Sequence, residues 1–272
     1  MIKKALLVMS CVLILGVCFL LAFQFTPEEI ADREKWEDFL KTSEIVGEKQ
    51  LGTGDSALAP WRLSLEKDGI SGSAIWKNPE GEIRGFLEGW KLEIAAYRLD
   101  KYLKLNMVPP TVEREFQGNR GCCQLWVTAE MDMRKKTREK IQTPANKVFS
   151  MNRAIYLQRA FDNLIANHDR HGGTILLTKD WRTILIDHSR SFGTSEEFTT
   201  ELIFTENDTE GPRIMRSLPM AFVESLKLLD VELMKEIVEI YLSDEEIEAV
   251  LIRRDLILDE IARLIEKYGE EN

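Results

Sequence analysis

Two short apolar runs in the second half of the chain, residues 174–177 and 184–186, are separated by a polar stretch at 179–182. β-branched and aliphatic residues favour strands and the polar stretch favours a turn, so the pattern predicts a β-hairpin. An antiparallel hairpin returns the chain to the end from which it started. Asp169, before the first strand, and Asp187, directly after the second, are therefore expected to lie side by side. One of two such carboxylates can orient a hydroxyl nucleophile while the other holds a divalent metal against phosphate oxygens.

Short motifs accompany both aspartates. The apolar segment FDNLIAN at 161–167 precedes the triplet DRH at 169–171, and the triplet LID follows at 185–187. Together they resemble the motifs of the atypical kinases, a group that includes the phosphatidylinositol 3-/4-kinase-like kinases, the HipA-type bacterial kinases and the secretory-pathway kinases related to the Golgi casein kinase.

The resemblance implies a role for each residue of these motifs. Asp169 is expected to be the catalytic base or to orient the acceptor, and Asp187 to bind magnesium. Arg170 and His171 complete the catalytic loop and are expected to brace it, Arg170 by pairing with a carboxylate.

The chain departs from the family pattern at one position. Many of these kinases carry an Asn, a second metal ligand, five residues after the catalytic Asp, whereas this chain has Thr174. A hydroxyl is a poorer ligand than an amide carbonyl for a hard cation. Because Thr174 stands at the position of this second ligand to the metal site of Asp187, either one metal suffices, another residue substitutes, or catalysis is impaired. A pseudokinase is therefore an alternative.

The first half of the chain has the order of a kinase small lobe. Turn signals at 68–69 and 78–81 separate β-rich segments, and apolar residues at helical spacing follow them. Strands are predicted at residues 45–46, 51–56, 61–65, 73–77 and 124–127, and a helix at 87–105.

The resemblance extends to this half. It implies that Lys77 is the strand lysine that contacts nucleotide phosphates and that Glu93 is the helix acid that pairs with it. Gly52 and Gly54 would let a loop approach the phosphates by its backbone, although a plain turn explains two glycines equally well.

The second half is predicted to be helical. A helix at 152–167 leads into the catalytic loop, and further helices are predicted at 219–229, 231–242 and 244–268. Ser243 with Glu246 three residues later is a capping-box signature at the start of the last helix.

Residues 5–25 form an apolar run of about the length that spans a hydrocarbon core of roughly 30 Å. Lys3 and Lys4 precede it and an acidic segment follows, so a signal anchor would leave the N-terminus in the cytoplasm and the main domain in a lumenal, periplasmic or extracellular space. A cleaved signal peptide is the alternative. The predicted organisation is an anchor at 1–26, a linker helix at 27–44, an N-lobe at 45–131 and a C-lobe at 132–272.

The net charge argues against one class of partner, and the positions of the cysteines argue against a disulfide framework. The formal net charge is -10 and no Lys/Arg run forms a stripe that would neutralise a phosphate backbone, which argues against nucleic-acid binding. Cys122 and Cys123 are adjacent and cannot staple distant segments, so two buried thiols are expected rather than a strained vicinal disulfide.

The sequence thus predicts an α+β, two-lobed protein-kinase-like fold behind an N-terminal transmembrane helix. ATP and Mg²⁺ or Mn²⁺ would bind between the lobes, and the γ-phosphoryl group would pass to a hydroxyl of an unknown protein, glycan or lipid. A pseudokinase scaffold is one alternative. A zinc hydrolase is another, because His168, His171 and His188 all lie in or beside the two Asp motifs.

Overall fold

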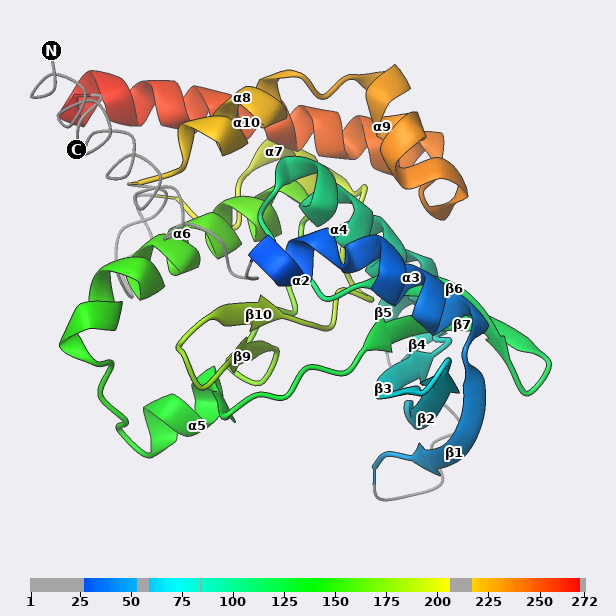
Figure 1. The fold of residues 1–272 in the computed structure, drawn as a ribbon. Helices are drawn as coiled ribbons and strands as arrows, with labels where there is room; N and C mark the ends of the chain where they lie inside the picture. Colours follow the sequence, from blue (N-terminus) through cyan, green and yellow to red (C-terminus); the bar gives the residue numbers. More distant parts are fainter. Residues whose placement is uncertain (1–26, 53–58, 84, 206–216, 270–272) are drawn as a thin grey trace, which may run out of the picture.

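An antiparallel sheet forms the core of the first lobe. The computed structural model describes residues 27–52, 59–83, 85–205 and 217–269, and its two lobes are drawn in Figure 1. The five strands run in the order β1-β2-β3-β7-β6. Leucines at alternate positions of β2 are buried while their neighbours are exposed, which is the period-2 pattern of a sheet with one covered face. The strands are β1 (Glu44–Gln50), β2 (Trp61–Lys67), β3 (Ile70–Lys77), β6 (Thr111–Phe116) and β7 (Asn119–Leu125).

Two helices before the sheet, α2 (Pro27–Ala31) and α3 (Arg33–Thr42), occupy the segment predicted to be a linker. Phe39 and Leu40 of α3 are buried in the same apolar cluster as the sheet residues. Gly72 in β3 lies against the Phe39 ring, where an added Cβ atom would come within 2.9 Å of the ring, so glycine allows this close approach. The segment is thus part of the N-lobe core as well as a connection.

A hairpin of β4 (Glu80–Ile83) and β5 (Phe86–Gly89) leads directly into α4 (Trp90–Leu103). The predicted helix therefore begins three residues later than expected, because residues 87–89 belong to β5. Helix α4 contacts β6 and β7 on one side and the helices of the second lobe on the other. Ten of its fourteen residues are buried.

The second lobe contains the predicted hairpin and a helical bundle. The hairpin pairs Thr183 with Leu177 and Leu185 with Ile175, which confirms the antiparallel ribbon. The capping box at Ser243 is present. The elements in chain order are β8 (Met131–Asp132), α5 (Met133–Arg138), η1 (Ala145–Lys147), α6 (Val148–Leu164), β9 (Ile175–Leu177), β10 (Thr183–Leu185), α7 (Glu196–Thr200), α8 (Met220–Lys227), α9 (Val231–Val238), η2 (Glu239–Tyr241) and α10 (Asp244–Tyr268).

Several predictions concern residues near or outside the described ranges. The apolar run at 5–25 lies outside them, and no helix in the described ranges is long and apolar enough to cross a membrane. The strand predicted at 51–56 is not found at 51–52, which follow β1 as a loop, and 53–58 lie outside the described residues. Cys122 and Cys123 are free, buried thiols in β7, as predicted.

Candidate active site

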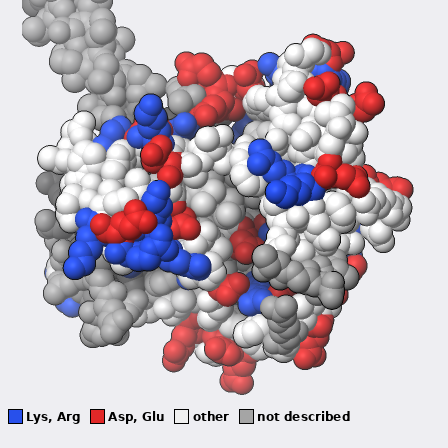
Figure 2. Space-filling model, turned by 90° about the horizontal axis from the view of Figure 1, so that it is seen from below, with Lys and Arg blue, Asp and Glu red and all other residues white. Residues whose placement is uncertain are grey.

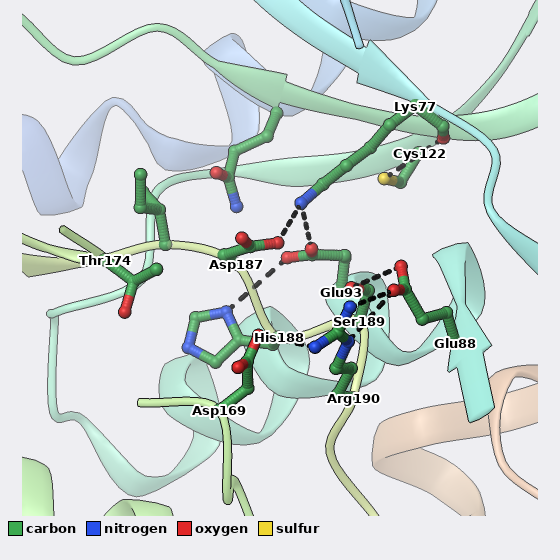
Figure 3. A network of polar contacts seen from close by, with 12 residues as sticks. Lys77, Glu88, Glu93, Cys122, Asp169, Thr174, Asp187, His188, Ser189 and Arg190 are labelled. Atoms are coloured by element: carbon green, nitrogen blue, oxygen red, sulfur yellow. Dashed lines mark hydrogen bonds and ion pairs between the residues drawn. The ribbon is translucent and has the colours of Figure 1, made fainter. Parts of the chain in front are cut away.

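Three predicted site residues meet between the lobes. Lys77 ends strand β3, Glu93 lies in the first turn of α4, and Asp187 follows β10. The Lys77 ammonium forms an ion pair with the Glu93 carboxylate and lies 2.8 Å from Oδ1 of Asp187. Figure 3 shows the lysine reaching from its strand to both acids. The structure therefore brings together three residues that are far apart in the sequence.

Charge pairing outweighs burial at this centre. Burial opposes the charged form of Lys77, but Glu93 and Asp187 raise its pKa well above the usual value. Burial would also raise the pKa of Glu93, yet Lys77 and His188 hold it far below the usual range. Both side chains are therefore charged at neutral pH, although Glu93 is fully buried.

His188, next to Asp187, contacts the other side of Glu93. Its Nδ1 atom lies 3.5 Å from Glu93 Oε2, and its ring packs edge-on against Phe161. Burial lowers the pKa of His188, although Glu93 opposes this shift. A neutral His188 can therefore steady the carboxylate that holds Lys77.

Arg170 ties the two aspartate loops together. Its buried guanidinium pairs with Asp162 of α6 through Nε at 3.0 Å, the carboxylate partner that the sequence analysis expected without identifying it. Its Nη1 donates to the carbonyl of Ile186 at 2.8 Å, the residue just before Asp187. The loop that carries Asp169 is thus fixed to the strand end that carries Asp187.

Thr174 and His171 form hydrogen bonds inside the loop that follows Asp169. The Thr174 hydroxyl donates to the His171 carbonyl at 3.0 Å and accepts from Arg170 Nη1 at 3.2 Å. Thr174 is also buried. These contacts make it a brace of the loop, and its role as a metal ligand stays a prediction. His171 accepts from the Gly173 amide through Nδ1 at 3.0 Å.

Asp169 connects to the other site residues through Arg190. Arg190 Nη1 lies 3.4 Å from Asp169 Oδ2, and its Nη2 lies 2.6 Å from Glu88 of β5. The Arg190 pKa is raised, first by Glu88 and also by Asp169 and Asp187. Figure 3 shows Arg190 bonded to Glu88 below the lysine centre. The Arg190 guanidinium is therefore shared by the carboxylates of Asp169 and Glu88.

The backbone at Asp187 is strained. Its φ angle is 65°, in the left-handed region that non-glycine residues rarely occupy. Such conformations persist where surrounding contacts determine them, and they cluster at functional sites. The bonds from Arg170 to Ile186 and from Lys77 to Asp187 supply such contacts here.

A cleft of about 700 Å³ opens beside Lys77 and Asp187. Its walls come from both lobes and from the segment that joins them, residues 125–129. Most of the lining is apolar. At its polar end Lys77 contacts Asp187 and Ser189 contacts Glu88, and the other polar lining residues are Gln124 and Thr128. An apolar pocket with a few convergent polar groups is typical of a ligand site.

The glycine and histidine predictions have different outcomes. Gly52 has a φ of 113° and follows Leu51, which lines the cleft, whereas Gly54 lies outside the described residues. The three histidines have separate partners: the His168 ring packs on Phe198, while His171 and His188 make the contacts given above. No group of three or more His, Cys, Asp or Glu side chains that could hold a metal occurs in the described ranges.

Sequence reasoning missed the residues that support the site. Asp162 lies within a helical pattern and Glu88 at the start of the predicted helix, and neither carries a local signal of its role. Arg190 lies just beyond the LID triplet at 185–187 and was given no role. The one sequence signal that could have pointed to this residue was the presence of an arginine three residues after Asp187, next to a kinase-like motif.

Comparison with known proteins identifies the fold. No protein-family model matches the chain, and no curated protein matches it significantly. The solved structure of Fam20 from hydra with a sugar aligns at a TM-score of 0.61 and 16% identity, covering 89% of this chain and 91% of that one.

The Golgi casein kinase aligns at a TM-score of 0.58 and 15% identity, covering 89% of this chain and 78% of that one. Its structure with Mn/ADP bound gives the same TM-score at 14% identity, with the same coverage of each chain. At such identities the likeness speaks for the fold alone. The chain therefore has the kinase-like fold of these secretory-pathway kinases, the group to which its motifs are similar.

Proposed function

We propose that the protein is an ATP-dependent phosphotransferase that transfers the γ-phosphoryl group to a hydroxyl of a protein, glycan or lipid acceptor. The observation that carries the proposal is the convergence of Lys77, Glu93 and Asp187 at the polar end of a cleft between two kinase-like lobes. Phosphoryl transfer depends mainly on positioning and charge stabilisation, and this arrangement offers both.

The residues present fit a nucleotide. The cleft volume of about 700 Å³ lies within the range of small-molecule sites. Its apolar walls, which include Ile75, Leu125 and Ile186, suit the faces of a purine. The charged end, with Lys77 at its centre, suits phosphates. The structure of the Golgi casein kinase with Mn/ADP supports a nucleotide and a divalent metal in this fold.

The residues also fit a metal that is shared with phosphates. Mg²⁺ is usually held by one or two carboxylates together with substrate phosphates and water. Asp187 and Glu88 both line the cleft, and the Asp187 side chain is 45% exposed. When bound, the metal would neutralise phosphate charge. Asp187 would hold it and Glu88, paired with Arg190, is a candidate second ligand.

The roles of the chain's own groups follow from their positions. Lys77, fixed by Glu93, would bind phosphate oxygens at the polar end of the cleft. Asp169, on the partly exposed loop beside Arg190, would accept or orient the proton of the acceptor hydroxyl. Arg170 would keep Asp169 and Asp187 at a fixed separation through Asp162 and Ile186.

A pseudokinase is the second candidate, and Thr174 is the observation that favours it. Its buried hydroxyl is occupied by loop bonds, which leaves the usual second metal ligand without an obvious replacement on this loop. A nucleotide could bind in the cleft without being turned over, and the protein would then act as a scaffold.

Nucleotide binding and transfer separate the two candidates. The purified chain is titrated with ATP and Mg²⁺ or Mn²⁺ and then assayed for transfer from labelled ATP to protein, glycan and lipid acceptors. We expect Asp169→Asn to retain binding and lose about 10²- to 10⁴-fold in transfer, and Asp187→Asn to lose metal-dependent binding. Asp259→Asn, on an exposed turn of α10, is the matched control. Binding without transfer supports the pseudokinase, and no binding with either metal refutes both.

We also propose that residues 5–25 anchor the protein in a membrane with the described domain on the extracytoplasmic side. The apolar length and the flanking charges support this placement. Alkaline carbonate extraction tests the anchor and protease accessibility in sealed vesicles tests the orientation. Release by carbonate, or protection of the domain in right-side-out vesicles, contradicts it.

A further inference from the structure

A basic face lies beside the catalytic loop of an otherwise acidic protein. Residues 133–153 contain seven Lys or Arg and one acidic residue, although the whole chain has a formal net charge of -10. No Lys/Arg stripe was expected from the sequence, yet five of these cations fall within residues 134–140, on and just after α5, and the other two follow on η1 and α6. The basic face consists of Arg134, Lys135, Lys136, Arg138, Lys140, Lys147 and Arg153.

Most of these cations have no acidic partner. Arg138 pairs with its neighbour Glu139 at 3.0 Å, and none of the other six is paired with a carboxylate of the described residues. Figure 2, which views the molecule from below, shows Lys and Arg gathered on the left, over α5, with some acidic groups among them. Unpaired cations on one face create a positive potential that attracts an anionic surface.

Apolar side chains are exposed at the start of α6, the next α-helix along the chain. Phe149 is 70% exposed and Val148 is 43% exposed, both in the first turn of α6. The Arg153 guanidinium lies 5.6 Å from the Phe149 ring centroid. Exposed aromatic and aliphatic residues among cations are typical of surfaces that insert shallowly into a lipid headgroup region.

The point at which the described chain begins lies near the basic face. The described chain begins at Pro27, two residues after the apolar run, and two residues reach at most about 7 Å. Glu29 of α2 forms an ion pair with Arg182 in the β9–β10 turn. In the same turn, the Trp181 ring lies 6.0 Å from the Lys136 ammonium of the basic face. The start of the described chain, the β9–β10 turn and the basic face therefore lie next to one another.

We propose that the basic face docks on the surface of a bilayer that contains anionic phospholipids. The proposal rests on the membrane anchor proposed above, not on kinase activity. Charge complementarity supplies the attraction, and Phe149 and Val148 supply the apolar contact. An acidic polypeptide is the rival partner, but it would not explain the exposed apolar pair or the adjacency to the anchor.

Docking would orient the catalytic loop. The Arg134 amide donates to the Gly172 carbonyl at 3.0 Å, and an added Cβ at Gly172 would come within 2.9 Å of the Arg134 nitrogen. Helix α5 therefore packs directly on the loop that carries Asp169. A domain held by this face would keep its catalytic loop near the bilayer surface.

Hydrogen–deuterium exchange of the full chain in nanodiscs tests the proposal. The nanodiscs contain phosphatidylcholine alone or phosphatidylcholine with phosphatidylglycerol, at low and high salt. We expect slower exchange of peptides from 133–153 with phosphatidylglycerol at low salt, and no change in the 244–268 helix. An added arm supplies polyglutamate to the chain in phosphatidylcholine nanodiscs.

Two matched double variants sharpen the test. Lys135→Gln with Lys140→Gln should lower the ratio of docked to undocked protein by about fivefold per lysine removed. Lys49→Gln with Lys104→Gln removes the same charge from exposed positions elsewhere and should leave exchange at 133–153 unchanged. Equal protection in both lipids, insensitivity to the first pair, or protection by polyglutamate alone overturns the proposal, and the last result assigns the face to acidic polypeptides. Failure to incorporate into nanodiscs would overturn the anchor and the proposal together, while leaving the kinase assays untouched.

Discussion

Removing either member of the buried Lys77–Glu93 pair tests whether this pair organises the site. Glu93 is fully buried, and the Lys77 side chain is only 14% exposed. Loss of one partner of a buried ion pair typically costs about 3–5 kcal/mol, because the other charge is left uncompensated. For Glu93→Gln we expect the lower end, about 3 kcal/mol, since Lys77 keeps Asp187 at 2.8 Å.

The reciprocal variant, Lys77→Met, should have a pH-dependent cost. Without the lysine, burial becomes the dominant influence on Glu93 and raises its pKa. The folded state then binds a proton that the unfolded chain, with a glutamate pKa of about 4.3, does not bind at neutral pH. Stability of the variant relative to wild type should therefore rise as the pH falls from 7 toward 5.

Urea unfolding followed by circular dichroism measures these changes. In the double-mutant cycle we expect a coupling energy of about 1–3 kcal/mol between the two positions. The exposed pair Lys91–Glu80, at 3.5 Å, is the matched control, and its cycle should give about 0.5 kcal/mol or less. Single losses below about 1 kcal/mol that simply add in the double variant would refute the buried pair.

Three further predictions concern the surrounding structure. His188→Gln should make stability less sensitive to acid. Burial lowers the pKa of His188, so below about pH 6.5 the unfolded wild-type chain binds a proton that the folded chain does not. This difference costs the wild-type protein up to about 1.4 kcal/mol of stability per pH unit. Parallel stability curves for the two proteins would contradict this. Arg170→Lys should cost about 2 kcal/mol and lower transfer, because lysine cannot bond Asp162 and Ile186 together, and unchanged urea midpoints would contradict it. Ser243→Ala should cost about 1 kcal/mol by removing the capping box, with Ser243→Asp as a near-neutral control in thermal unfolding.

Local signals in the sequence predicted the parts of the structure that local chemistry determines. The hairpin follows from two β-branched runs around a polar turn, and α10 follows from its capping box and apolar stripe. The roles of Lys77 and Glu93 came from the resemblance to a kinase small lobe, in which such a lysine lies on a strand and its acid on the next helix, and the two residues do pair.

Long-range contacts determine what the sequence did not predict. Edge strand β6 has the sequence TVEREF and was not predicted. Its apolar and polar residues do not alternate clearly, because Arg114 turns back to donate hydrogen bonds to the carbonyls of Leu40 and Ser43. That contact also explains why the predicted linker packs on the sheet. The Arg190–Glu88 pair joins residues 102 positions apart, and no local pattern marks such a pair.

Helix α4 is held between the two lobes by its buried contacts. In this helix Glu93 is buried together with neighbours that face the sheet and the helices α8 and α9. Arg33 and the amides of Met107 and Val108 bind Asp100 near the end of the same helix. Rotating α4 to separate Glu93 from Lys77 would expose that apolar surface at about 25 cal/mol per Å² and break these bonds. A nucleotide bound as proposed would therefore meet a lysine that is already positioned by α4.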